Sequence, residues 1–164
     1  MGVIMGMRRS IIEYSRGNDL RHFWHLYKLQ KRAKSRLLHD SLTFMMSRSA
    51  YRHGGYIGPD AVIKNLPVLP HGLQGIFISR YAEIGENCRI YQNVTIGEVN
   101  REAPVIGDNC LIGAGAVIIG GIRIGNNVCI GAGAVVNKDV PDNCTVVSQP
   151  VRMIQGRGKF ESSF

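Results

Sequence analysis

Aliphatic residues recur at every sixth position over most of the chain from Tyr56 onward. Glycine often follows the aliphatic anchor directly, and a small or compact residue stands four positions after it. Amphipathic helices repeat every 3.6 residues and ordinary strands every two, so a period of six indicates an internal repeat. The anchors are Ile57, Ile63, Leu69, Ile78, Ile84, Ile90, Ile96, Ile106, Ile112, Ile118, Ile124, Ile130 and Val136.

A six-residue unit accommodates one short strand and one turn, and three such units close a triangular coil. The anchor points inward, glycine permits the turn, and successive coils stack at about 4.8 Å as in a parallel sheet. The sequence therefore predicts a mainly β protein, a left-handed parallel β-helix of about five coils between about Tyr56 and Ile154. Cys88 and Cys110 occupy the small inward position, which predicts core packing.

The period breaks at two places. Ile78 follows Leu69 by nine positions and Ile106 follows Ile96 by ten, where an offset of six is expected. Insertions in a solenoid form loops on its outside, often at the binding face. The first insertion contains His71 and the second comprises residues 98–104.

The N-terminal third has a helical pattern. Ser10 and Glu13 have the spacing of a capping box, and Asn18 or Asp19 would cap a longer helix that runs to about Ser47. One apolar stripe is expected on it, from Leu20, Trp24, Tyr27, Leu38, Leu42 and Met45. The predicted organisation is a basic α-helical segment (1–52), a β-helix domain (53–155) and a C-terminal tail (156–164).

Composition excludes several classes of protein. The 164 residues are 45% hydrophobic, too aliphatic for wholesale disorder and too few for two full-size domains. No apolar run approaches the roughly 20 residues that cross a bilayer. Arg8 and Arg9 follow the apolar start instead of preceding it, which is not the order of an export signal. Four separated cysteines without a CxxC motif favour reduced thiols and a cytoplasmic location.

The net charge of +8 belongs entirely to residues 1–52, which hold eleven Lys/Arg and three Asp/Glu. A solvated helix face beside a packing stripe explains such charge. The alternative is a basic surface attracted to anionic lipid at the inner membrane face, or to a polyanionic acceptor. No nucleic-acid recognition motif accompanies the charge, so a nucleic-acid partner is not expected.

The repeats carry motifs of a known family. Four segments resemble the C-terminal coils of hexapeptide-repeat acetyltransferases, and two more are similar to the serine acetyltransferase branch with its polysaccharide-modifying relatives. The resemblance covers residues 56–155 and implies an acetyl-CoA-dependent O-acetyltransferase that works as a homotrimer with active sites between neighbouring β-helices, or as a dimer of trimers. The segments are Gly113-Ala-Gly-Ala116, Gly131-Ala-Gly-Ala134, Val136-Asn-Lys-Asp-Val-Pro141 and Gln149-Pro-Val-Arg152, then Leu69-Pro-His-Gly72 and Tyr91-Gln-Asn-Val-Thr-Ile-Gly97.

The resemblance implies a catalytic histidine in the first coils, and His71 matches it. His71 is also the only one of the five histidines inside the repeats. An imidazole, with an ordinary pKa of about 6.5, can take the acceptor's hydroxyl proton and pass it to the leaving thiolate. A turn histidine without chemistry is the alternative. Gly72 and Gly75 would supply an oxyanion-stabilising N–H or serve loop geometry only.

The coenzyme side is predicted in the last coils. Ala114 and Ala132 are eighteen residues apart, one full coil, so they and the adjacent Gly115 and Gly133 stack on one face. The pantetheine arm would lie there against bare backbone, although the same residues also suit a tight corner. By the resemblance, Lys138 and Arg152 match positions that meet the coenzyme phosphates; both are otherwise ordinary surface charges.

Several positions depart from the serine acetyltransferase pattern. Tyr56 stands where an aspartate orients the family's histidine, fifteen residues before it, and Pro70 replaces the aspartate directly before it. Tyr56 would hydrogen-bond the imidazole without stabilising an imidazolium as a carboxylate does.

The second active-site histidine of the family is replaced by Ala103, beside Arg101 and Glu102. Arg101 and Glu102, with Gln92, are the candidate substrate contacts. The replaced groups are those that hold the ammonium and carboxylate of the amino acid, which weakens L-serine as the acceptor.

The main functional hypothesis is therefore acetyl transfer to a sugar hydroxyl in polysaccharide biosynthesis, with His71 as general base. One alternative is a serine O-acetyltransferase of cysteine biosynthesis, and another is a non-catalytic β-helix scaffold. A zinc enzyme of the γ-carbonic anhydrase kind needs about three histidines, so no metal is expected.

Overall fold

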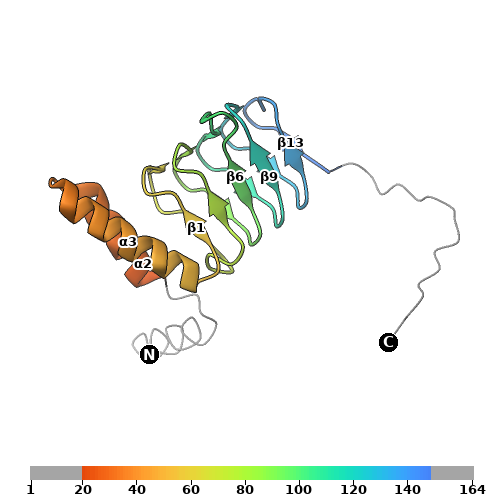
Figure 1. Ribbon diagram of the computed structural model, residues 1–164. Helices are drawn as coiled ribbons and strands as arrows, with labels where there is room; N and C mark the ends of the chain where they lie inside the picture. Colours follow the sequence, from red (N-terminus) through yellow and green to blue (C-terminus); the bar gives the residue numbers. More distant parts are fainter. Residues whose placement is uncertain (1–19, 149–164) are drawn as a thin grey trace, which may run out of the picture.

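The computed structural model describes residues 20–148, two helices followed by a β-helix (Figure 1). Helix α2 (Arg21–Arg32) and helix α3 (Arg36–Arg52) form a hairpin, so the predicted single helix to about Ser47 is wrong. The break occurs because Ser35 is extended and its Oγ accepts a hydrogen bond from the N–H of Leu38 (3.2 Å), which starts a new helix. The predicted caps before Leu20 lie outside the described residues.

The break also changes which side chains are buried. Leu20 and Tyr27 are buried as predicted, but Leu38 and Met45 are exposed. A helix that restarts at Ser35 has a new phase, so residues beyond the break cannot continue the stripe of α2. The hairpin buries instead Phe23, Leu26, Met46 and Ala50.

Thirteen short strands form three parallel sheets, which confirms the predicted β-helix. Sheet A has the order β1-β3-β6-β9-β12, sheet B β10-β7-β4-β2 and sheet C β13-β11-β8-β5. The described strands make about four turns instead of the predicted five, and isolated bridges at Val68 and Val140 extend sheets C and B at the ends. The strands are β1 (Tyr56–Ile57), β2 (Val62–Ile63), β3 (Phe77–Ile78), β4 (Glu83–Ile84), β5 (Arg89–Ile90), β6 (Thr95–Gly97), β7 (Val105–Ile106), β8 (Leu111–Ile112), β9 (Val117–Ile119), β10 (Arg123–Ile124), β11 (Cys129–Ile130), β12 (Val135–Val136) and β13 (Thr145–Val146).

The interior of the prism is filled by the predicted anchors. All are buried except Ile63 and Leu69 of the first coil, which are half-buried. The first insertion adds Leu73 and Ile76 to the core, both fully buried. Helix α2 lies against the first coil of the prism, where the hydroxyl of the buried Tyr27 donates to the carbonyl of Ala61 (2.9 Å).

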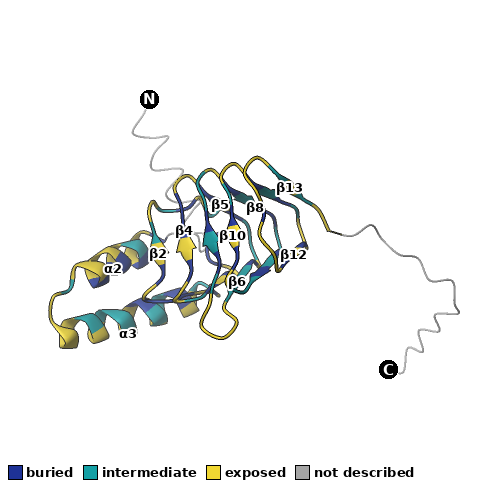
Figure 2. Ribbon diagram, turned by 90° about the horizontal axis from the view of Figure 1, so that it is seen from above, coloured by how far each residue is buried: buried dark blue, intermediate teal, exposed yellow. Residues whose placement is uncertain are grey.

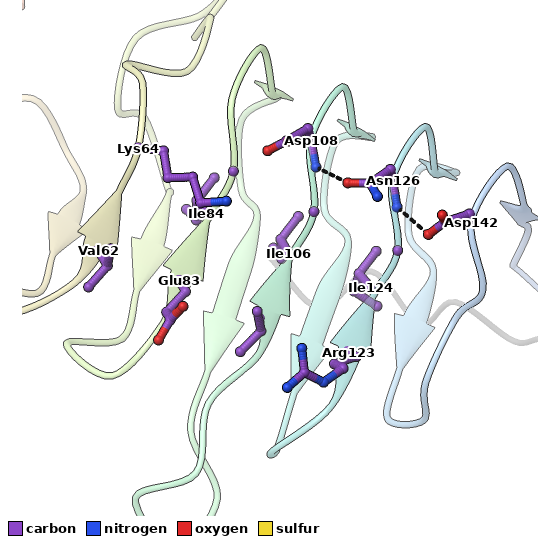
Figure 3. A pocket seen from close by; sticks show the side chains of 14 residues that line it. Val62, Lys64, Glu83, Ile84, Ile106, Asp108, Arg123, Ile124, Asn126 and Asp142 are labelled. Atoms are coloured by element: carbon purple, nitrogen blue, oxygen red, sulfur yellow. Dashed lines mark hydrogen bonds between the residues drawn. The ribbon is translucent and has the colours of Figure 1, made fainter.

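Asparagine, and not glycine, takes the left-handed conformation at the corner between sheets B and C. Asn87, Asn109, Asn127 and Asn143 have φ between 55° and 59°, and their amides form a ladder of Nδ2–H to Oδ1 hydrogen bonds (3.0–3.3 Å). A second ladder joins backbone N–H groups to the side chains of Asp108, Asn126 and Asp142; Figure 3 shows two of its bonds. These ladders link successive coils along the corner.

Within residues 20–148, neither helix is both long and apolar enough to cross a membrane.

Candidate active site

Two edges of the prism flank sheet A, and the predicted site residues divide between them. The histidine edge, between sheets C and A, comprises residues 69–75, 91–93, 113–115 and 131–133. The loop edge, between sheets A and B, comprises residues 58–61, 79–82, 98–104, 120–122 and 137–139. Each edge is a stack of turns from successive coils, so residues on one edge lie side by side although they are far apart in sequence.

His71 projects from the turn at the start of the histidine edge. Its side chain is exposed, and its ring centroid lies 6.1 Å from that of Tyr91, with the planes inclined by 47°. Tyr91 follows strand β5 one coil later and is half-buried, so it forms one wall beside the imidazole. Tyr91 stood in the family motif without an assigned role; its place one coil after the His71 turn was the available signal.

The backbone N–H groups of Gly72 and Gly75 already donate to backbone carbonyls. Gly72 donates to the carbonyl of Leu69 (3.1 Å) and Gly75 to that of Gly54 (2.8 Å). Both glycines have left-handed φ, 66° and 67°. Loop geometry therefore explains them, and an oxyanion donor must be sought at another N–H.

Backbone hydrogen bonds connect the His71 turn to the small-residue corners. Gly115 donates to the carbonyl of Gln92 (3.0 Å) and Gly133 to that of Ala114 (2.9 Å). A Cβ at Gly115 or Gly133 would meet no other atom within 4 Å, so the space over these corners is open. The structure thus brings His71, Ala114 and the corner of Ala132 onto one edge, with open space over the glycines.

Gln92 lies on the same edge, between the His71 turn and the corner of Ala114. Its Oε1 is buried and has no hydrogen-bond partner. An unpaired buried amide oxygen costs free energy. Because this oxygen has almost no accessible surface, it can accept a hydrogen bond from a ligand only after the Gln92 side chain turns outward.

The second insertion projects from the loop edge as a small hairpin (Figure 2). Val99 and Glu102 pair in antiparallel fashion, and Asn100 and Arg101 have φ of 54° and 68°, as in a type I′ turn. The carboxylate of Glu102 lies against Gly121 of the next coil, where a Cβ would come within 2.8 Å of Oε2. Arg101 and Glu102 are thus held on the loop edge of their own chain.

Two more acidic groups are fixed on the loop edge. Glu98 accepts a hydrogen bond from the hydroxyl of Ser79, and Asp60 lies 3.6 Å from Nε of Arg80. No role was predicted for these residues from the sequence. The available signal was that each acidic residue and its partner lie on turns one coil apart.

Lys138 is exposed on the loop edge after β12, across sheet A from the alanine corners. Tyr56 lies on β1, the edge strand of sheet A beside β3, and is 36% exposed. Among residues 20–148 no hydrogen bond joins Tyr56 to His71. Arg152 lies outside the described residues. One chain therefore does not bring the loop-edge candidates to His71.

The cysteines of the core carry no site. Cys88 and Cys110 are buried and their thiols lie 3.3 and 3.2 Å from the carbonyls of Gly107 and Gly125. The hydrogen bond with the Cys110 thiol, together with burial, raises the pKa of Cys88, which keeps it a neutral thiol. Within residues 20–148 no cluster of three His, Cys, Asp or Glu side chains is arranged to hold a metal ion.

A shallow groove of about 330 Å³ runs along the outer face of sheet B (Figure 3). Lys64, Glu83, Arg123 and Asp142 are among its lining residues. It contains none of the predicted site residues, because those described lie on the two edges that flank sheet A or on strand β1 of that sheet.

Comparisons with known proteins agree with this architecture. Residues 103–138 match the family described as Bacterial transferase hexapeptide (six repeats). The matched residues are part of the longer repeat region, whose sequence period and triangular coils are similar to those of hexapeptide-repeat transferases.

Its relatives in sequence are serine acetyltransferases. The protein of that name from Staphylococcus xylosus is 38% identical over 138 residues, which are 82% of this chain and 60% of the relative. The one from Synechococcus elongatus is 42% identical over 109 residues, 64% of this chain and 44% of the relative.

The solved structures to which the chain is similar are also serine acetyltransferases. Serine acetyltransferase isoform 3 of Entamoeba histolytica, in complex with cysteine, matches with a TM-score of 0.70 and 30% identity over 83% of this chain and 50% of that chain. The Neisseria gonorrhoeae enzyme in complex with serine matches with a TM-score of 0.67 and 34% identity, over 80% of this chain and 55% of that chain. These similarities confirm the predicted serine acetyltransferase-like branch of the hexapeptide-repeat family. The chain spans about half the length of these relatives.

Proposed function

We propose that this chain is an O-acetyltransferase that moves the acetyl group of acetyl-CoA to a hydroxyl acceptor. The observation that carries the proposal is the histidine edge, where an exposed imidazole and open, small-residue corners lie on one line of stacked turns. The similarity to serine acetyltransferases over more than four-fifths of the chain supports it.

In the proposed reaction, His71 takes the proton of the acceptor hydroxyl as its oxygen attacks the thioester carbonyl carbon. The tetrahedral intermediate then breaks its carbon–sulfur bond, and the coenzyme thiolate leaves with the proton from His71. No acyl-enzyme is required when both substrates are bound together, because proximity lowers much of the barrier. The pantetheine arm would run over Gly115 and Gly133 toward His71.

Completion of the site requires a second chain in this proposal. Lys138, Arg101 and Glu102 belong to the loop edge, on the other side of sheet A from His71. A homotrimer would place the loop edge of one protomer against the histidine edge of its neighbour, where Lys138 would meet the coenzyme phosphates. Arg152 is likewise proposed to meet the coenzyme phosphates. A dimer of trimers remains an alternative assembly in this proposal.

L-serine is the first acceptor we propose, because the relatives are named serine acetyltransferases. This replaces the sugar acceptor favoured by the sequence, which the relatives do not support. A sugar hydroxyl remains the second candidate, since Pro70 and Ala103 replace side chains of the serine acetyltransferase pattern and Tyr56 replaces the aspartate that orients its histidine. The proposed location is the cytoplasm.

An acceptor screen tests the proposal directly. The purified full-length protein is given acetyl-CoA and, in parallel, L-serine, free sugars and a nucleotide sugar, with release of the coenzyme thiol as the signal. We expect thiol release that depends on L-serine, and rescue of a cysteine auxotroph. Turnover of a sugar without serine turnover would favour the second candidate, and no release with any alcohol would favour a non-catalytic scaffold.

A further inference from the structure

The turn of the helical hairpin concentrates positive charge. We call residues 28–38 the hairpin tip: the end of α2, the connection and the start of α3. Five cations lie within it and no acidic residue occurs between positions 20 and 39. In Figure 1 the tip lies at the opposite end of the molecule from β13. The cations are Lys28, Lys31, Arg32, Lys34 and Arg36.

The same tip exposes large apolar side chains. Leu37 is 81% exposed, Leu38 51% and Leu29 39%. Leu29 and Leu38, with Arg32 and Lys34, line a shallow apolar groove of about 510 Å³ between the helix ends. The described part of the chain leaves these leucines exposed. Burying them requires an apolar surface from outside it.

A second groove adjoins the first, and both are lined by Arg32. It has a volume of about 420 Å³ and lies between α2 and the first coil, with Lys28 and Lys31 at its side and Ile63 and Leu66 among its apolar lining. Tyr27 fixes this groove through its hydrogen bond to Ala61. A groove lined by both cationic and apolar side chains fits an anionic head group attached to hydrocarbon.

Lys31 is exposed, but its ammonium group lies beside an aromatic ring at this groove. Its Nζ lies 5.5 Å from the ring centroid of Tyr27. Burial lowers the pKa of Lys31, and the charge of Asp60 opposes the shift only in part. An anion in the groove would stabilise this partly desolvated ammonium group. Asp60 is itself 3.6 Å from Arg80 and does not line the groove.

We propose that the hairpin tip binds the surface of a membrane that contains anionic phospholipid. The lysines and Arg32 contact the phosphate head groups, and Leu37 and Leu38 enter the boundary of the acyl region. Basic residues beside exposed leucines favour a lipid surface over nucleic acid, which offers no hydrocarbon to the leucines. The inference is independent of the proposed acetyl transfer.

Vesicle sedimentation of the full-length protein tests the charged part. Binding is measured to phosphatidylcholine vesicles with and without phosphatidylglycerol, for wild type, for Lys28→Gln with Lys31→Gln, and for the control Arg48→Gln with Arg89→Gln. The control removes two exposed cations outside both grooves. We expect binding only to the anionic vesicles, a loss of about tenfold or more in the groove variant, and a clearly smaller loss in the control.

The apolar part is tested with Leu37→Ser combined with Leu38→Ser, against Tyr51→Ser, which is also 81% exposed but lies at the far end of α3. We expect the leucine variant alone to lose vesicle binding at moderate salt. Three results would overturn the proposal: a loss in each control equal to that in its tip variant, no preference for anionic vesicles, or full binding by the leucine variant. So would a change in oligomeric state of the leucine variant without lipid, because the tip would then be a contact between copies of the chain.

Discussion

Left-handed backbone at the corners determines which residues this β-helix tolerates at each turn. Asn109 and Asn127 adopt it between sheets B and C, where their side chains also form the ladder. Gly115 and Gly133 adopt it on the histidine edge, with φ of 69° and 67°. Gly113, two positions earlier, is glycine for another reason, because its Cβ would come within 2.6 Å of the backbone nitrogen of Ala132.

Two neighbouring substitutions separate these reasons. Gly113→Ala should lower the free energy of unfolding by about 3 kcal/mol, because backbone atoms of the next coil cannot yield easily. Gly115→Ala should cost only about 1 kcal/mol, for its left-handed φ. Its methyl group would enter the open space over the corner and raise the KM for acetyl-CoA. Denaturant unfolding and steady-state kinetics measure both effects, and equal stability losses would contradict the explanation.

Short strands and corners were predictable from the sequence, but the hairpin was not. The six-residue period located the buried anchors because each coil repeats the same environment, as at Ile112 and Ile130. The break after α2 was not predicted, because Leu38 and Leu42 continue the apolar spacing across it. The signal for the break was Ser35, which caps a new helix. Because the prediction continued one apolar stripe through the break, it also missed that leucines of the hairpin tip are exposed.

At the element scale, we predict that one hydrogen bond fastens the hairpin to the β-helix. Tyr27→Phe removes the donor to Ala61 and leaves a carbonyl without its partner, which should destabilise the protein by about 1–2 kcal/mol. Tyr51→Phe, at a position 81% exposed, should have no measurable effect. Thermal or urea unfolding compares the two variants. Equal stability of Tyr27→Phe and wild type would mean that apolar packing alone holds α2.

For the whole molecule, the sequence located the candidate residues but not their division between two edges. Ala114 and Ala132 share one edge because eighteen residues make one coil, and His71 joins them because its turn also follows sheet C. Lys138 and Arg101 fall on the other edge because they follow strands of sheet A instead of sheet C. The division was missed because the anchors were not grouped three to a coil. Grouped in this way, Leu69 before His71 is a third anchor and Ile96 before Arg101 is a first anchor.

The outer row of sheet A is the face between the two edges, and it is largely apolar. Phe77 is 51% exposed and Val135 67%, and both point outward in register with β6 and β9. If this face joins protomers of 18.1 kDa into a trimer, Phe77→Glu should shift the sedimenting species to the monomer. Val68→Glu, exposed by 53% on sheet C, is the matched control and should leave the trimer intact. A monomeric wild type would contradict this part of the proposal.

The central claim is that the imidazole of His71 moves the acceptor's proton, and its most direct test is kcat for coenzyme release in the presence of L-serine. His71→Gln should reduce kcat by about 10²- to 10⁴-fold with little change in acetyl-CoA binding or in unfolding, because His71 is exposed. His22→Gln, on the exposed side of α2, should be as active as wild type. A His71→Gln protein that keeps kcat within about twofold of wild type would contradict the account.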